Sequence, residues 1–311
     1  MSQPYLRVAC AQFCPAYKDP QASMEKADRL ISRLQPGEID LLVLPEMAFA
    51  GYCFKSREDI APLVEDAHGG QTVQWAKKTA QSLGCYVLVG LPTSSTPEGS
   101  GEAASSSSNF SSNSPAPFYN ALLVVSQAGE ILHLYAKHFL YETDEAWATV
   151  GPSFQSFDLP FPPSSPFSAP NRTFRLAPAI CMDLNPYRFE APFEAFEFGT
   201  FAAEQQVDVV VASMSWLDSE PPNADQEEEE KDGNEWEKVK PTLGYWTLRL
   251  DPLLGSNAAL VCANRIGREG DTLFTGSSCA IELGNRPAVV GFAGKRREEL
   301  LNVRVRLPAR E

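Results

Sequence analysis

The sequence predicts an α/β protein in which two β-sheets pack together and helices cover their outer faces. Strand-like apolar runs alternate with segments of helical periodicity along the chain, and several runs are almost wholly apolar, as in strands that are covered on both faces. The hydrophobic content of 43% in 311 residues is ample for a large buried core. Two sheets with helices outside them would bury all of these elements.

The first half of the chain alternates strands and helices. Residues 21–34 place apolar side chains at helical spacing, whereas residues 40–45 are apolar almost throughout, as in a buried strand. We expect, in order, a strand at 6–13, a helix at 21–34, a strand at 40–45, a helix at 72–83, a strand at 85–91 and a hairpin pair at 119–125 and 130–136.

The second half continues the alternation. We expect a strand at 174–180, a helix at 191–206, a β-branched strand at 207–213, a helix at 243–254 and strands at 258–263, 278–283 and 303–307. Three segments interrupt the pattern: 94–117 contains ten serines, 160–170 contains five prolines, and 218–240 contains ten acidic residues. The first and third read as low-complexity insertions and the second as a stiff surface connection, so we predict a single domain over residues 1–311.

Composition excludes several functional classes. The net charge is −14, of which segment 218–240 carries half, and no basic face suggests nucleic-acid or anionic membrane binding. No apolar stretch approaches the ~20 residues that span a bilayer. The seven cysteines are odd in number and lack metal-ligand spacing, so reduced thiols and no metal are expected. We expect a cytoplasmic protein, with a mitochondrial form from an alternative start left open.

Three strand-like runs each end in a polar side chain that can do chemistry. These side chains are Glu46 in Leu-Pro-Glu-Met, Lys137 in Tyr-Ala-Lys-His and Cys181 in Ile-Cys-Met-Asp. A thiol can attack an amide, a carboxylate can move the protons, and an ammonium can stabilise the charge on the carbonyl oxygen. The trio therefore predicts amide hydrolysis without a metal or an organic cofactor.

Each residue of the trio also has an ordinary interpretation. Cys181 alone could be a small buried hydrophobe, and Glu46 and Lys137 could be solvated charges at strand ends. The context favours chemistry, because an apolar strand before Cys181 meets a sharp turn that can lift the thiol into a cleft. His138 would be the partner in a Cys–His mechanism, but adjacent strand residues face opposite ways, so we favour a structural role for it.

The three segments, in this order, resemble the catalytic segments of the nitrilase or carbon–nitrogen hydrolase superfamily. The matching stretches are 8–12, 44–46, 137–140 and 179–183, so the resemblance covers nearly the whole chain. A narrower resemblance, to the fungal protein N-terminal asparagine/glutamine amidohydrolases, lies in residues 181–189, 191–193, 197–198, 214–217, 140–147 and 244–246. Such enzymes deamidate an N-terminal Asn or Gln to Asp or Glu and feed N-degron proteolysis.

The resemblance implies a four-layer αββα sandwich of two mixed β-sheets covered by helices, and it implies roles for several residues. Cys181 would be the nucleophile, Glu46 the proton carrier, and Lys137 with the backbone N–H of Met182 would stabilise the oxyanion. The family has a second glutamate after the lysine; we prefer Glu145, near Trp147, while Glu142 stays an alternative. The expected partners are peptides or proteins with a free N-terminal Asn or Gln, and the oligomeric state stays open.

The substrate pocket is less determined than the chemistry. Asp183 is our candidate acceptor for the substrate's α-ammonium group, although it could equally cap the turn after the nucleophile. Trp216 and Tyr187 are candidate pocket walls or core aromatics. A rival substrate class is a free small ω-amide or carbamoyl compound, which Arg188 could clamp through a carboxylate. A rival from another class is an inactive scaffold that binds a partner through its acidic segment.

Overall fold

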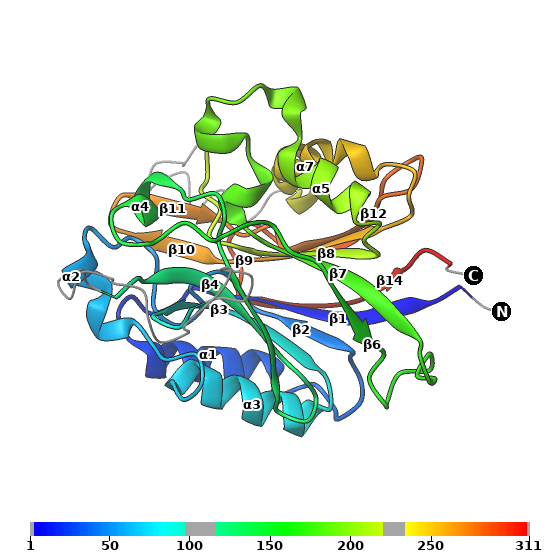
Figure 1. Cartoon of the computed structure of the whole chain (residues 1–311), viewed down its shortest axis with the longest axis horizontal. Helices are drawn as coiled ribbons and strands as arrows, with labels where there is room; N and C mark the ends of the chain where they lie inside the picture. The colour runs from blue at the N-terminus through cyan, green and yellow to red at the C-terminus, as the bar shows by residue number, and fades with distance from the viewer. Residues whose placement is uncertain (1–2, 97–115, 220–233, 310–311) are drawn as a thin grey trace, which may run out of the picture.

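The computed structural model describes residues 3–96, 116–219 and 234–309. Within these ranges two six-stranded sheets lie face to face (Figure 1). Sheet I has the spatial order β14 (Glu299–Arg306), β1 (Tyr5–Gln12), β2 (Leu41–Val43), β3 (Tyr86–Thr93), β4 (Tyr119–Val125) and β5 (Ile131–Ala136). β1, β2 and β3 are parallel, whereas β14, β4 and β5 pair antiparallel with their neighbours, so the sheet is mixed.

Sheet II has the same mixed character. Its spatial order is β13 (Ala288–Phe292), β12 (Cys279–Glu282), β9 (Ala259–Asn264), β8 (Val209–Met214), β7 (Thr173–Ile180) and β6 (Phe157–Pro160), with β7, β8 and β9 parallel. A separate hairpin, β10 (Ile266–Glu269) with β11 (Thr272–Thr275), lies beyond the end of β9.

Helices cover the outer face of each sheet, which confirms the predicted four-layer αββα sandwich (Figure 1). α1 (Pro20–Ile31) and α3 (Gln71–Leu83) cover sheet I, while α5 (Glu197–Glu204) and α7 (Glu235–Arg249) cover sheet II. Shorter helical pieces are α2 (Arg57–Ile60), α4 (Glu142–Glu145) and the 3₁₀ turns η1 (Ala61–Leu63), η2 (Cys181–Leu184), η3 (Tyr187–Phe189), η4 (Phe193–Ala195) and η6 (Asp251–Leu253).

The alternation of side chains along each strand divides the core into layers. In β2, Leu41 and Val43 face sheet II, whereas Leu42 packs against the helices of sheet I. A strand that is buried on both faces has no polar side to show, which explains why its sequence is apolar at every position.

Three expectations about segments are corrected. The acidic insertion was expected to reach residue 240, but α7 begins at Glu235, with Asn234 capping it through the N–H of Trp236. Acidic residues in a first helical turn are favoured by the helix dipole, so the charge pattern marked a helix start as well as a loop. Within 191–206 only 197–204 is α-helical, because Phe196 has a left-handed φ of 44°, which is incompatible with a helix that continues through it. Residues 161 and 167, expected in a surface connection, are buried phenylalanines of the inter-sheet core.

The remaining differences concern the predicted helix at 243–254, which ends at Arg249, the last strand, which begins at Glu299 instead of residue 303, and several short strands. β6, β13 and the β10–β11 hairpin were absent from the predicted elements, and most other boundaries shift by one to three residues. Residues 97–115 and 220–233, which make up most of the two expected insertions, lie outside the described residues. Across the described ranges, none of the helices combines the length and hydrophobicity needed to cross a bilayer.

Candidate active site

Glu46 lies just after β2, where sheet I meets the end of β8 in sheet II. Its side chain is fully buried, and Oε1 accepts hydrogen bonds from Asn120 Nδ2 and Lys137 Nζ, both at 2.7 Å. Oε2 accepts the backbone N–H of Ser215 at 2.8 Å, so residues from both sheets hold the carboxylate in place.

Lys137 follows β5 and is also fully buried. Its ammonium donates to Glu46 Oε1 and, at 2.6 Å, to Oδ2 of Asp144 in the short helix α4. Asp144 Oδ1 accepts Asn120 Nδ2 at 3.0 Å, and Oδ2 also accepts the hydroxyl of Tyr52 at 3.3 Å. One cation is thus shared between two buried carboxylates, which fixes where its remaining N–H can point.

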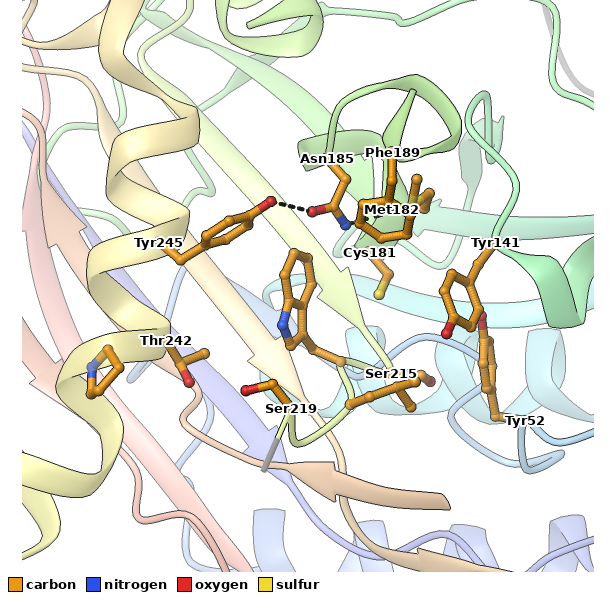
Figure 2. A pocket seen from close by; sticks show the side chains of 13 residues that line it. Tyr52, Tyr141, Cys181, Met182, Asn185, Phe189, Ser215, Ser219, Thr242 and Tyr245 are labelled. Carbon is orange, nitrogen blue, oxygen red and sulfur yellow. Dashed lines mark hydrogen bonds between the residues drawn. The ribbon is translucent and has the colours of Figure 1, made fainter. Parts of the chain in front are cut away.

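Cys181 is the first residue after β7 and begins the 3₁₀ turn η2. Its φ of 40° is in the left-handed region, which a residue with a side chain occupies only at a cost of about 1–3 kcal/mol. This backbone conformation ends the strand at Cys181, and 8% of the residue is exposed to solvent. The predicted strand followed by a sharp turn is therefore present, and Sγ faces a cavity (Figure 2).

The buried carboxylate of Asp183 stabilises this turn by accepting four hydrogen bonds. Its Oδ1 accepts the N–H groups of His138 and Phe139, and its Oδ2 accepts the N–H of Ile180 and the hydroxyl of Tyr135. These four contacts tie the segment after β5 to the segment after β7. The Lys137 and Cys181 segments are consequently held at a set separation.

Burial and neighbouring charges set the protonation of the centre. Burial raises the pKa of Glu46, Lys137 opposes this rise and Asp144 adds to it. Burial would lower the pKa of Lys137, but the carboxylates of Asp144 and Glu46 outweigh it, so that pKa lies above its usual value. Burial and then the charge of Glu46 raise the pKa of Cys181. The resting thiol is therefore protonated and needs a base when it attacks.

A cavity of about 460 Å³ opens over Cys181, a size typical of small-ligand sites. Figure 2 shows the thiol between Tyr52 and Tyr141 on one side and Asn185 and Tyr245 on the other. The other lining residues are Met182, Phe189, Ser215, Trp216, Leu217, Ser219, Pro241 and Thr242. No acidic or basic side chain lines this cavity within the described ranges. The buried Glu46 bonds to the backbone of Ser215, which lines the cavity, and Lys137 bonds to Glu46.

The structure corrects the expected position of the second acid. Glu145 points outward: its side chain is 43% exposed and its Oε1 pairs with Arg188 at 2.9 Å. Glu142 is also exposed, whereas Asp144 between them is buried against Lys137. In helix α4, Glu142 and Glu145 are three positions apart and share one face, whereas Asp144 lies on the face that meets Lys137 and also accepts the N–H of Tyr141 at 3.1 Å.

Two of the three expected substrate-binding residues lie elsewhere. Trp216 lines the cavity as expected. Tyr187 is 44% exposed and packs on Phe139 rather than lining the cavity. Asp183 is fully buried, and its carboxylate accepts four hydrogen bonds. It therefore caps the turn after Cys181, as the alternative expectation had it, and does not reach a ligand in the cavity. His138 binds the carbonyl of Gly151 through Nδ1 at 2.7 Å, in line with a structural role.

Sequence reasoning missed several residues that surround the centre. Asn120 bridges Glu46 and Asp144, and Tyr52 touches Asp144 and lines the cavity. Asn120 had a signal, since an amide at the second position of an otherwise apolar strand is seldom buried without a partner. Tyr52 had no such signal, because its role depends on segments that are distant in sequence. Ser215 lies in the segment 214–217 that carries the family resemblance, but only the fold shows its bond to Glu46.

Comparison with known proteins agrees with this geometry. The model of the carbon-nitrogen hydrolase family matches residues 7–186. Over 302 residues the chain is 33% identical to the protein N-terminal amidase of Schizosaccharomyces pombe, covering 92% of this chain and 94% of that protein. It is 32% identical over 203 residues to the protein N-terminal amidase of Saccharomyces cerevisiae, covering 63% of this chain and 40% of that protein.

A solved structure of an N-terminal amidase with a Gln-Val peptide has the same fold. The TM-score is 0.77 at 21% identity, over 97% of this chain and 98% of that one. The resemblance inferred from the sequence motifs is thereby confirmed. The family match spans more than half of the chain and the S. pombe relative matches over nearly its whole length, so the protein belongs to the carbon–nitrogen hydrolase family, in the branch of the protein N-terminal amidases.

Proposed function

We propose that the protein hydrolyses the side-chain amide of an N-terminal Asn or Gln, releasing ammonia and leaving Asp or Glu at the peptide's first position. The observation that carries the proposal is the strained Cys181 in a cavity whose lining residues Ser215 and Tyr52 bond to the buried cluster of Glu46, Lys137 and Asp144. The full-length similarity to a protein N-terminal amidase supports the choice of substrate.

The first half of the reaction forms a thioester. Glu46 takes the proton of the Cys181 thiol as sulfur attacks the carboxamide carbon. The Lys137 ammonium and the backbone N–H of Met182 stabilise the negative oxygen of the tetrahedral intermediate. Glu46 then gives its proton to the departing nitrogen, the C–N bond breaks, and ammonia leaves.

The second half returns the enzyme to its starting state. Glu46 takes a proton from a water molecule whose oxygen attacks the thioester carbon. The second tetrahedral intermediate collapses, the C–S bond breaks, and the thiolate of Cys181 recovers its proton from Glu46. One water is consumed and one carboxylate forms, while Asp144 and Asn120 keep Lys137 and Glu46 in place throughout.

The cavity favours a peptide over a small dicarboxylate monoamide. A free carboxylate on a small substrate would call for an arginine or lysine beside the cavity, and none lines it in the described part of the chain. Arg188, the sequence candidate for such a clamp, is 53% exposed and paired with Glu145. Arg188 is therefore not placed to clamp the carboxylate of a small ω-amide substrate in this cavity, as that alternative hypothesis required.

The α-ammonium group of a peptide needs acceptors when it enters the cavity. Asn185, which lines the cavity, can supply one, because among the described residues its Oδ1 accepts a single hydrogen bond, from the hydroxyl of Tyr245 at 2.7 Å (Figure 2). A carbonyl oxygen has a second lone pair, so Asn185 can accept from an ammonium without losing Tyr245.

Ammonia release from four substrates tests the proposal. We expect turnover of peptides that begin with Asn or Gln, and none of the same peptides acetylated at the N-terminus, nor of internal Asn. A free small ω-amide is the fourth substrate, and Cys181→Ser is the control that should lose turnover and stay folded. Similar rates on the acetylated peptide or the free ω-amide would replace the proposal with a general amidase.

A further inference from the structure

The β10–β11 hairpin touches the active site without lining its cavity. From β10, Glu269 accepts the backbone N–H groups of both Tyr52 and Cys53 at 2.9 Å through Oε2. Glu269 is buried, so these two bonds are shielded from water and fix the turn that carries Tyr52.

The ring of Tyr52 is held by the same hairpin. Phe274 of β11 packs edge-to-face against it, with ring centroids 6.0 Å apart and an interplanar angle of 87°. Held at its backbone and its ring, Tyr52 directs its hydroxyl to Asp144 Oδ2 at 3.3 Å, next to the ammonium of Lys137. The phenol of Tyr52 therefore links the hairpin to Asp144, while β11 also pairs with the cavity wall, where the N–H of Thr275 donates to the carbonyl of Trp216 at 3.0 Å.

Arg265, at the base of the hairpin, joins these two supports. Its fully buried guanidinium forms an ion pair with Glu269 and lies 4.0 Å from the centroid of the Phe274 ring. Among the described residues its guanidinium nitrogens have no hydrogen-bond partner of good geometry. A buried ion pair gains little net stability, because removing its charges from water costs as much as their attraction gains. Stability of the fold therefore does not by itself account for Arg265 at this position.

We propose that Arg265 and Glu269 are positioning residues that place the hydroxyl of Tyr52 on Asp144 and so tune the proton transfers of Glu46 and Cys181. The proposal rests on the assignment of these two residues as base and nucleophile. Asp144 raises the pKa of both groups. A hydrogen bond from Tyr52 withdraws part of the charge of Asp144, so loss of that bond raises both pKa values further.

The pH dependence of Cys181 alkylation by iodoacetamide tests this without any substrate. Tyr52→Phe should move the alkylation midpoint to higher pH and lower the rate at neutral pH by roughly tenfold, the order expected for one hydrogen bond to a charged group. Glu269→Gln should reproduce this shift, because a neutral amide oxygen accepts the two N–H groups more weakly than a carboxylate does and carries no charge to pair with Arg265. The double variant Glu269→Gln with Tyr52→Phe should show no further shift.

Glu269→Gln leaves the buried guanidinium of Arg265 without its counter-charge, which could unfold the variant. A second variant, Arg265→Met/Glu269→Gln, removes both charges of the pair. If Arg265→Met/Glu269→Gln is folded, it should show the same shift of the alkylation midpoint as Tyr52→Phe. A wild-type profile in either folded variant, or additive shifts with Tyr52→Phe, would overturn the proposal. Asp40→Asn is the matched control: Asp40 pairs with Arg7 at 2.6 Å and accepts its N–H, before β2 at the end away from Glu46, so its profile should be unchanged.

The peptide assay separates this inference from the proposed function. If the wild-type protein hydrolyses none of the four substrates while the alkylation shifts occur as expected, the substrate assignment fails and the positioning role stands. If the peptides are hydrolysed and the alkylation profiles of the Glu269 variants match the wild type, the positioning role fails alone.

Discussion

At the scale of residues, the charge balance of the site depends on which of three neighbouring acids faces inward. Asp144 shares the ammonium of Lys137 with Glu46, so the two carboxylates and one ammonium carry a net charge of −1. Glu145, one position on, pairs with Arg188 at the surface. Exposed ion pairs contribute little, whereas breaking a buried one leaves an uncompensated charge.

Substitution of these two acids should therefore have opposite outcomes. Asp144→Asn should reduce kcat by about 10²-fold or more, the order seen when a group that stabilises an oxyanion is disturbed, because Lys137 loses one of its two anchors. Glu145→Gln should keep kcat and KM within about twofold, since a surface ion pair of this kind contributes up to about 1 kcal/mol. Steady-state kinetics on an Asn-initiated peptide measures both. Equal losses in the two variants would contradict the placement of Asp144.

The raised pKa of Glu46 sets the acid side of the pH profile. Glu46 accepts a proton only when it is ionised, so kcat/KM should fall as the pH falls through this raised pKa, at a higher pH than for an exposed glutamate. Asp144→Asn removes a negative charge that raises the pKa, and the acid limb of the residual activity should move to lower pH. Profiles of kcat/KM for the two proteins provide the measurement. A shift in the other direction would show that Glu46 is not the group that titrates.

At the scale of elements, close approach between neighbouring strands positions Glu46. Gly90 in β3 lies directly against the chain that leaves β2: a Cβ there would stand 2.6 Å from Cα of Glu46 and 2.6 Å from N of Met47. The Gly90 carbonyl also accepts the N–H of Ala48 at 3.0 Å. The neighbouring atoms are backbone and cannot move aside as a flexible side chain would.

Gly90→Ala should for this reason displace Glu46. We expect a loss of kcat of at least about tenfold, because a base displaced from hydrogen-bond reach transfers protons poorly. Peptide turnover, with thermal unfolding to confirm that the variant is folded, is the measurement. Gly69→Ala is the matched control, since nothing lies within 4 Å of a Cβ at that position. Unchanged kinetics in folded Gly90→Ala would show that the turn after β2 can shift without moving the carboxylate.

At the scale of the whole molecule, the site exists only while the two sheets are packed together. Glu46 and Lys137 come from the ends of β2 and β5 in sheet I, and Cys181 and Ser215 follow β7 and β8 in sheet II. Direct bonds cross between the sheets here, including Ser213 Oγ to the carbonyl of Leu44 at 2.8 Å. The core that separates the sheets therefore also sets the distance between base and nucleophile.

Leu88, fully buried between the sheets in β3, provides the test at this scale. Leu88→Ala should lower the free energy of unfolding by about 2–5 kcal/mol, as large-to-small core substitutions do. Activity and fluorescence should be lost at the same urea concentration, because the sheets separate together. Leu248→Ala on the outer side of α7, where the side chain is 48% exposed, is the control and should change stability little. Activity lost well before fluorescence would indicate a site that opens while the sheets stay packed.

The layers of the fold and the three chemical residues could be predicted from the sequence. Continuous apolar runs are recognisable without tertiary knowledge, because burial on both faces leaves a strand no polar position. Glu46, Lys137 and Cys181 were recognisable because each ends such a run, where strand termini converge at one edge of a sandwich. The fungal amidase resemblance rested on the same local segments, so it too needed no long-range contact.

The features that depend on the direction of a side chain, or on partners distant in sequence, could be read only from the folded structure. Three acids in four positions look alike in sequence, and only the path of α4 selects Asp144 over Glu142 and Glu145. Asp183 could have met a ligand or capped a turn, and four donors from two segments assign it to the turn. Glu269 and Tyr52, which are more than 200 positions apart, are joined by a hydrogen bond that only the packing of distant segments creates. Such a contact does not follow from local backbone preference, so no periodic pattern in the sequence predicts it.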